Sequence, residues 1–317
     1  MSLHIYVQAD VSAPAPWARP QPTLGDSPDG SGDAKGDHEL MLNYAVHAYH
    51  SHARLVFAIA VVGAIAAERA AAWWRRCHID SAEVATSMVS GAAFLLAKTL
   101  VARIAFLAVS LEVYDRYRLF ELDLTNPMVW VLMFVLRDLV YYWVHRAEHR
   151  VSALWASHMV HHSPETMSFT NAVRVPWMEA VYKPWLGLWV PFIGFNPFAF
   201  VVLDIAAATY AQLYHTTAVR RHRLLDWFIV TPSTHRVHHG SNREYIDKNF
   251  SAVFIIWDRL FGTYEPEVAS VRFGLAGDKS IDSPVDALVG GYPALFETVR
   301  QQQSIAAGVR VALAPPA

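Results

Sequence analysis

Two long apolar segments joined by a short uncharged turn constrain the topology of this chain more than any other feature. They cover Val175–Ile193 and Phe195–Leu213, and the turn GFNP at 194–197 joins them. Each segment approaches the roughly 20 apolar residues that a membrane-spanning helix requires. Because two successive spans return the chain to the side it left, we expect the histidine-rich sequences before and after this pair to lie on one side of a membrane.

Three earlier segments have a similar composition. The chain is 54% hydrophobic and only 17% charged, whereas soluble domains carry about 25% charged residues. The sequence therefore predicts an all-α integral membrane helical bundle of about four to five hydrophobic segments. Lys98, Arg103 and Arg137 lie inside these segments and leave a soluble, very apolar helical protein as the alternative. The three segments are Arg54–Trp74, Met88–Leu111 and Pro127–Val144.

Composition also excludes several classes of function. The net charge of -2 argues against a nucleic-acid partner, which normally demands a basic excess. The single cysteine, Cys77, excludes an internal disulfide and a cysteine-ligated iron–sulfur cluster. Residues 1–39 are rich in Pro, Gly, Asp and Ser, so we expect a disordered polar tail and no signal peptide.

Eight of the 16 histidines fall into three tight groups. Residues three or four apart share a face of a helix, so each group presents two or three imidazoles from one surface. Eight neutral imidazoles exceed what one zinc ion takes and suit two ions of a first-row metal such as iron, zinc or copper. The groups are His145 and His149; His158, His161 and His162; and His235, His238 and His239.

Further residues are candidates for the same site. His215 ends the last apolar segment and is a candidate ninth ligand. Asp138 lies seven residues before His145, where its carboxylate could accept the second N–H of a ligand imidazole or instead pair with an arginine. Asp247 and Asn249 are similar candidates. The other histidines are predicted to be solvated: His4, His38, His47, His50, His52, His78 and His222.

The histidine motifs resemble those of the sterol desaturase/fatty acid hydroxylase superfamily. YYWVHRAEH, LWASHMVHHSPE and TPSTHRVHHGSNREYIDKNFSAVFIIWDRLFGTYEPE carry the resemblance, from about Arg137 to Glu267. The last block is especially similar to the branch that contains alkylglycerol monooxygenase and many bacterial sterol desaturase-like proteins. The family's HxxxH and two HxxHH motifs fall on the eight grouped histidines, and its histidine after the central hairpin falls on His215.

This resemblance implies an integral-membrane di-iron oxygenase with two iron ions held by these histidines in a helical cap. We expect hydroxylation or desaturation of an unactivated C–H bond in a lipid of sterol, carotenoid, fatty acyl or ornithine-lipid type, with O2 and two electrons. The donor would be external, a ferredoxin, a cytochrome or a reduced pterin, since no nucleotide-binding motif is present. The expected divisions are N-terminal membrane helices at 40–126, a catalytic domain at 127–267 and a C-terminal tail at 268–317.

The distribution of arginine predicts the orientation in the membrane. RR at 75–76 and RRHR at 220–223 lie on the histidine side of the spans, while the GFNP turn on the other side has no charge. The positive-inside rule therefore places the histidines in the cytoplasm, in a bacterial inner membrane. Two other functions stay open: a zinc-dependent membrane hydrolase and a metal or proton transporter. Arg174 and the RRHR stretch could dock an acidic electron donor.

Overall fold

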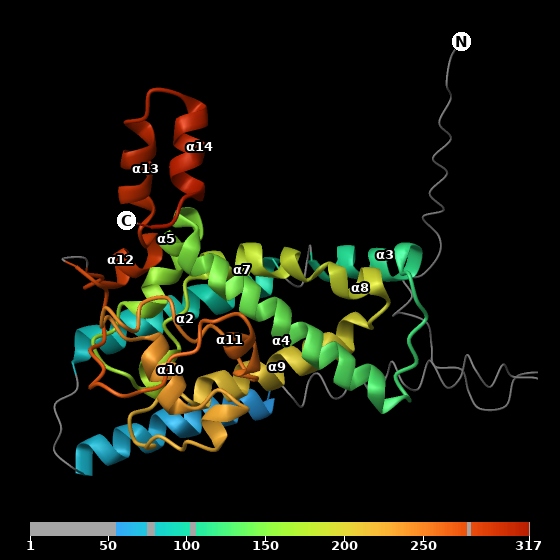
Figure 1. Ribbon diagram of the computed structural model, residues 1–317, viewed down its shortest axis with the longest axis horizontal. Coiled ribbons are helices and arrows are strands. Elements are labelled where there is room, and N and C mark those ends of the chain that lie inside the picture. Colours follow the sequence, from blue (N-terminus) through green and yellow to red (C-terminus); the bar gives the residue numbers. More distant parts are fainter. Residues whose placement is uncertain (1–54, 75–79, 102–105, 278–279, 317) are drawn as a thin grey trace, which may run out of the picture. The chain divides into compact units, whose positions relative to one another are not determined.

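The computed structural model describes residues 55–74, 80–101, 106–277 and 280–316, and these ranges contain helices and no strand. The predicted polar tail and six of the predicted solvated histidines lie outside them. The helices are Leu55–Trp74, α2 (Ser81–Val101), α3 (Leu107–Tyr117), α4 (Pro127–Arg150), α5 (Ser152–His162), α6 (Phe169–Ala172), α7 (Trp177–Tyr182), α8 (Trp189–Ile193), α9 (Pro197–Leu213), α10 (Pro232–His238), α11 (Ile256–Leu260), α12 (Pro284–Val289), α13 (Tyr292–Arg300) and α14 (Ile305–Leu313), with short 3-10 turns η3 (Lys183–Gly187) and η4 (Leu225–Trp227) (Figure 1).

Three of the helices that position the histidines, α4, α9 and α10, begin at well-formed caps. Asn126 caps α4 by accepting from the backbone N–H of Met128, and Asn196 caps α9 in the same way. Thr231 and Thr234 form a reciprocal capping box at the start of α10. A proline follows each cap at the first helical position, where its missing N–H costs nothing. These signals fix where the helices start and therefore which face each histidine occupies.

In the described part of the chain, two helices are long and apolar enough to cross a membrane by length and composition. They are Leu55–Trp74 and α4, and α9 is a shorter apolar helix. The predicted segment Met88–Leu111 falls on α2 and α3, and neither passes this criterion. The predicted all-helical class is confirmed, whereas a bundle of four to five spans stays a prediction.

The expectation of one continuous span over Val175–Ile193 is wrong. This stretch consists of α7, η3 and α8. Pro184 lies at the start of η3 and has no N–H to donate, so it interrupts a regular α-helical ladder. Glu179 and Lys183 form an ion pair with each other, and Lys183 also pairs with Glu148. On a lipid-facing helix these charged side chains would have no such partners.

The turn between α8 and α9 requires glycine. Gly194 has φ 118°, and a Cβ at this position would lie 1.9 Å from the carbonyl oxygen of Phe120. The backbone N–H groups of Leu119 and Phe120 donate to the carbonyls of Phe192 and Ile193. These bonds hold the segment that follows α3 against the turn. The uncharged turn thus reverses the chain as predicted, and α9 delivers His215 to the histidine cluster.

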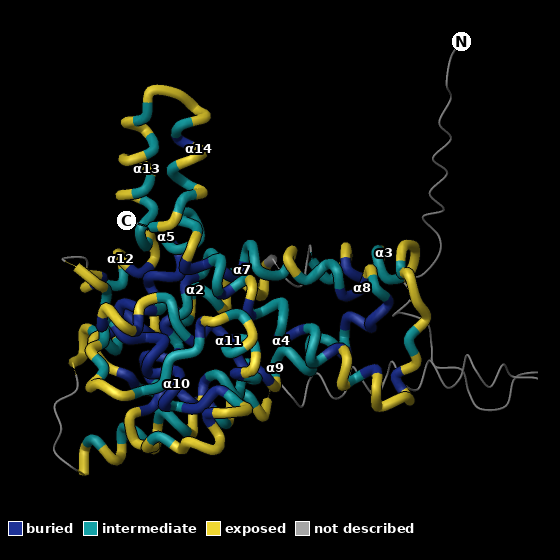
Figure 2. The backbone as a smooth tube through the Cα atoms, viewed as in Figure 1, coloured by how far each residue is buried: buried dark blue, intermediate teal, exposed yellow. Residues whose placement is uncertain are grey.

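The C-terminal region is folded, in contrast to the tail expected at 268–317. Met159 and Val160 of α5 form a small core with Ile281 and Ala287, and the N–H of Gly291 binds the carbonyl of Ala156 at 2.7 Å. Figure 1 shows α13 and α14 as a hairpin next to α5. Figure 2 shows that buried positions gather around α5 and α10, where the histidines lie.

Candidate metal centre

The structure brings the nine candidate histidines together in two adjoining groups. Within each group, one ring nitrogen from every histidine lies within 4.8 Å of all the others. We call them the five-histidine group, His145, His149, His158, His162 and His238, and the four-histidine group, His161, His215, His235 and His239.

Helix geometry explains how each HxxHH motif serves both groups. In α5, His158 and His162 are one turn apart and join the five-histidine group, while the intervening His161 joins the other. In α10 the pattern is reversed, since His235 and His239 join the four-histidine group and His238 joins the five-histidine group. Adjacent residues point about 100° apart on a helix, so each HH pair divides between two neighbouring sites.

Hydrogen bonds to Nδ1 fix the orientation of most of these rings. A carbonyl or carboxylate oxygen can only accept, so an Nδ1 bound to one must carry the proton, and Nε2 then has a free lone pair. Five rings have such a partner within 3.2 Å: His145 on the carbonyl of Phe250, His158 on Glu179, His161 on the carbonyl of Arg174, His215 on the carbonyl of Ala211 and His238 on the carbonyl of Lys248.

The free lone pairs face one another inside the cluster. The Nε2 atoms of His145 and His158 lie 3.0 Å apart, and those of His161 and His215 lie 3.5 Å apart. Two unprotonated nitrogens at such distances repel unless a cation lies between them. Four further buried Nε2 atoms have no hydrogen-bond partner, those of His149, His162, His238 and His239. The donor set therefore fits a pair of metal ions.

Burial keeps five of these imidazoles neutral, which is the form that binds metal. Removal from water lowers the pKa of His215 to about 4. The same cause, together with the neighbouring rings, lowers the pKa of four more rings well below the ordinary value: His161, His162, His235 and His239. A proton is thus a poor substitute for a metal cation in this cluster.

A buried charge network supports the five-histidine group from α4 and α7. Glu179 accepts from Nδ1 of His158 at 2.8 Å, and its other oxygen lies 2.5 Å from Nζ of Lys183. Lys183 also lies 3.0 Å from Glu148, which accepts a hydrogen bond from the hydroxyl of Tyr182. Glu179 was not among the site residues predicted from the sequence. The signal was an acid and a base four residues apart within an apolar segment, a spacing that places both on one helical face.

Replacing Glu179 by alanine is expected to weaken metal binding by about 10- to 100-fold, because His158 would lose the group that fixes its tautomer. Glu179→Gln keeps an oxygen acceptor and should lie between alanine and the unmodified protein. The measurement is the metal retained by purified protein against increasing chelator, with the exposed Glu297→Gln as a control. Equal retention in all four proteins would show that Glu179 does not support the centre.

The predicted supporting residues differ in what they contact. Oδ1 of Asp247 lies 3.6 Å from Nδ1 of His149, next to the histidines as expected. Asp138 instead accepts from the backbone N–H groups of Val253 and Phe254 and from the indole N–H of Trp257. The expected bond from Asp138 to an imidazole is absent from the described residues, because this carboxylate holds the loop after Phe250.

Asn249 has a similar structural role. Its side-chain amide donates to the carbonyls of Thr234 and Glu265, and its oxygen accepts from the N–H of Glu265 at 2.8 Å. Its positive φ of 56° is one that asparagine adopts more readily than most residues. Asn249 thus joins α10 to the segment before Glu267 through hydrogen bonds to backbone groups.

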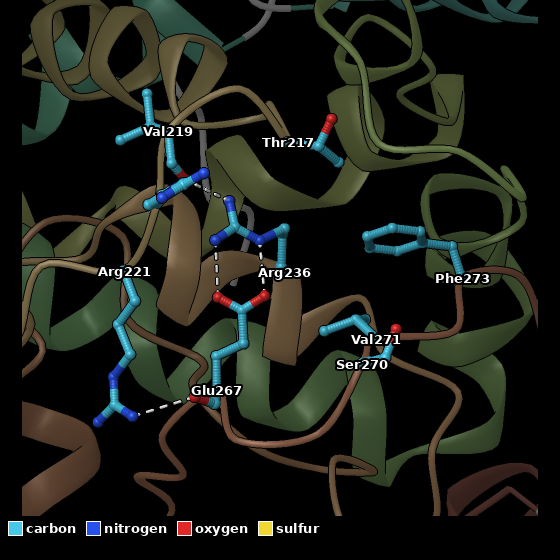
Figure 3. Close-up of a pocket in the computed structure, with 9 residues that line it drawn as sticks. Thr217, Val219, Arg221, Arg236, Glu267, Ser270, Val271 and Phe273 are labelled. Atoms are coloured by element: carbon cyan, nitrogen blue, oxygen red, sulfur yellow. Dashed lines mark hydrogen bonds and ion pairs between the residues drawn. The ribbon is translucent and has the colours of Figure 1, made fainter.

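Arg236 joins three parts of the chain that meet at the four-histidine group. Its guanidinium forms two parallel bonds with Glu267, at 2.8 and 2.6 Å, and donates to the carbonyl of Val219 at 2.9 Å (Figure 3). It also donates to the carbonyl of Thr216 at 2.9 Å. Thr216 directly follows His215, while Arg236 directly follows His235. The arginine therefore holds the two histidines in register.

A pocket of about 390 Å³ lies against this ion pair, and none of the nine histidines lines it. Its lining includes the ring of Phe273 and four charged side chains, those of Arg220, Arg221, Arg236 and Glu267 (Figure 3). Four of the five N–H donors of Arg236 are already used by protein oxygens. The pocket is therefore a feature next to the metal centre and not the reaction site.

The structure also shows the surroundings of His222 and Arg174, two residues that the sequence predicted to lie at the surface or to dock a partner. His222 is exposed, as expected of a solvated residue. Arg174 is buried and donates to the hydroxyls of Ser87 and Ser163 and to the carbonyl of Glu83. It cannot dock an electron donor from that position, and its backbone carbonyl instead orients His161.

The fold and the site define a class of protein: a helical chain whose buried imidazoles form two adjoining metal-type centres. Residues 130–263 match the family model "Fatty acid hydroxylase". The matched residues include all nine histidines of the two groups, and the curated relatives fit the sterol desaturase/fatty acid hydroxylase superfamily.

The chain is also similar to curated relatives. It is 39% identical over 163 residues to alkylglycerol monooxygenase of Xenopus tropicalis, covering 51% of this chain and 36% of the relative. The human alkylglycerol monooxygenase is 37% identical over 180 residues, 55% of this chain and 39% of the relative. Ornithine lipid hydroxylase OlsE of Rhizobium tropici is 29% identical over 150 residues, 46% of this chain and 45% of the relative. The aligned region thus spans less than half of each relative, and no solved structure matches the chain.

Proposed function

We propose that this protein is a membrane di-iron oxygenase that hydroxylates an unactivated C–H bond of a lipid. The observation that carries the proposal is that Nε2 atoms of neighbouring histidines face each other at 3.0 and 3.5 Å within two adjoining groups. The relatives' names, a monooxygenase of alkylglycerols and a hydroxylase of ornithine lipids, support a lipid substrate and oxygen insertion.

In this proposal the five-histidine group holds one iron ion and the four-histidine group holds the other. Iron is compatible with imidazole ligands and supplies the redox chemistry of O2 that protein side chains lack. The reaction balances as C–H, O2, two electrons and two protons giving C–OH and water. Electrons come from an external donor, for which a ferredoxin, a cytochrome or a reduced pterin remain candidates.

The protein's own residues contribute orientation and exclusion of water. Oxygen acceptors at Nδ1 keep the Nε2 lone pairs of His145, His158 and His238 directed into the cluster. Burial of the rings excludes bulk water that would otherwise compete for the centre. Glu179, Lys183 and Glu148 place buried charge next to His158, and Asp247 places a carboxylate next to His149.

We further propose that residues 127–267 form the catalytic unit in a bacterial inner membrane, with the histidines on the cytoplasmic side. The exposed Arg220 and Arg223 and the partly buried Arg221 lie between His215 and α10, on the histidine side of the candidate spans. Positive residues retained on that side favour a cytoplasmic location.

Mass spectrometry of lipids extracted from cells with and without the intact gene tests the proposed reaction. We expect a lipid that gains one oxygen atom in mass when the protein is present, together with O2 consumption by membranes supplied with a reductant. Lipid profiles that do not differ, with zinc alone in the purified protein and no O2 uptake, would support a zinc-dependent hydrolase and contradict the oxygenase.

A further inference from the structure

An exposed apolar turn lies between His215 and α10. The exposed fractions of Leu224, Trp227 and Phe228 are 66%, 59% and 63%. Each of these residues lies within ten positions, along the chain, of His215 or His235. The neighbouring Asp226 is buried, where it accepts from the hydroxyl of Thr231. A soluble surface seldom exposes several large apolar side chains together, so this turn marks an interaction site.

The apolar surface continues onto α11. Ile256 and Leu260 are exposed on this helix. Between them, Arg259 donates to the carbonyl of Asp226 at 2.9 Å, and its guanidinium lies 4.1 Å from the ring centre of Trp227. The turn and α11 are therefore joined by a direct contact and form one surface.

The same surface reaches the C-terminal half of α4, one of the two candidate spans. The ring of Phe261, which follows α11, lies 4.8 Å from that of Trp143 on α4. Trp143 is exposed, and the guanidinium of Arg146 lies 5.5 Å from its ring. Aromatic residues at the end of a span mark the level of the lipid headgroups.

Charge identifies the kind of partner. Between residues 219 and 228, Arg220 and Arg223 are exposed, Arg221 is partly buried, and the sole carboxylate, Asp226, is buried. An exposed surface that combines arginine with tryptophan, phenylalanine and leucine matches the composition of elements that lie in a membrane interface. A lipid phosphate complements the arginines, and the outer acyl region accommodates the apolar side chains.

We propose that residues 219–228 and α11 form a membrane-interface surface that lies in the headgroup region next to the end of α4. This inference rests on the proposed membrane location and adds the face that meets the lipid. It places the histidine cluster at the bilayer surface, since the same turn connects His215 to α10. A lipid chain could then approach the centre without leaving the membrane.

Quenching of a fluorophore tests this surface. The full chain would carry Cys77→Ser and a single cysteine at either Leu224 or Phe228, labelled with bimane and reconstituted in phosphatidylcholine–phosphatidylglycerol vesicles. Lipids brominated on the acyl chains report contact with the membrane, and iodide reports contact with water. A label at Gln303, in the exposed connection between α13 and α14, provides the water-exposed reference.

We expect brominated lipids to cause a loss of fluorescence at Leu224→Cys and Phe228→Cys, with a blue-shifted emission and weaker iodide quenching than at the reference. Strong iodide quenching without an effect of brominated lipids at both positions would overturn the proposal and leave the surface free for a soluble protein partner. Metal content and product formation are measured on the same samples, so failure of the oxygenase proposal would be seen separately.

Discussion

Replacing His238 by alanine is expected to reduce product formation to background and to remove metal from the five-histidine group. The Nε2 atom of His238 is buried without a partner, and its Nδ1 is held by the carbonyl of Lys248. Its ring also lies next to the rings of His145 and His162, at 4.4 and 4.7 Å. A shortened side chain cannot reach the centre, and a cavity with fewer donors would bind metal weakly.

The matched control is His222→Ala, which alters an exposed histidine outside both groups. This variant should retain its metal, because His222 supplies no donor to either group. Metal content by mass spectrometry and product by lipid analysis would be measured on the same preparations. A His238→Ala protein that still forms the product would contradict the assignment of the five-histidine group.

Replacing Arg236 by methionine is expected to lower the free energy of unfolding by about 3–5 kcal/mol, because Glu267 would keep a charge without its partner. The exposed fraction of Arg236 is only 7%. The carbonyls of Thr216 and Val219 would also lose a donor. Denaturant unfolding of the purified protein in detergent measures the change.

The double variant Arg236→Met with Glu267→Leu separates the charge from the packing. Apolar side chains in place of both partners should recover most of the lost stability, since no unpaired charge then remains. If the single and double variants unfold alike, the ion pair is not what stabilises this region. The exposed Arg220→Gln variant should unfold like the unmodified protein.

The sequence allowed eight of the nine histidines to be predicted because their spacing follows helix geometry, while His215 was predicted from its place at the end of an apolar segment. Spacings of three and four place imidazoles on one face, and the uncharged turn at Gly194 implied that distant groups return to each other. The division into groups of five and four could not be predicted, since it depends on how α5 and α10 face each other. Glu179 was missed for a related reason: its contact with His158 joins α7 to α5.

Two fold predictions failed at positions where local chemistry outweighed hydropathy. The segment Val175–Ile193 is apolar enough to suggest one span, yet Pro184 divides it and Glu179 turns inward. The region 268–317 was expected to be a C-terminal tail, but it contains the short helices α12 to α14, which pack against α2 and α5. Asp138 was predicted to orient an imidazole or to pair with an arginine; it accepts from backbone N–H groups and lies 3.8 Å from Arg137.

The metal content of the purified, full-length protein tests the central claim most directly. Two adjoining groups of imidazoles predict about two iron ions per chain, with O2 consumed when a reductant and a membrane lipid are supplied. A preparation that binds zinc alone, with no O2 uptake after reconstitution with iron, would contradict the assignment of this centre as a di-iron oxygenase.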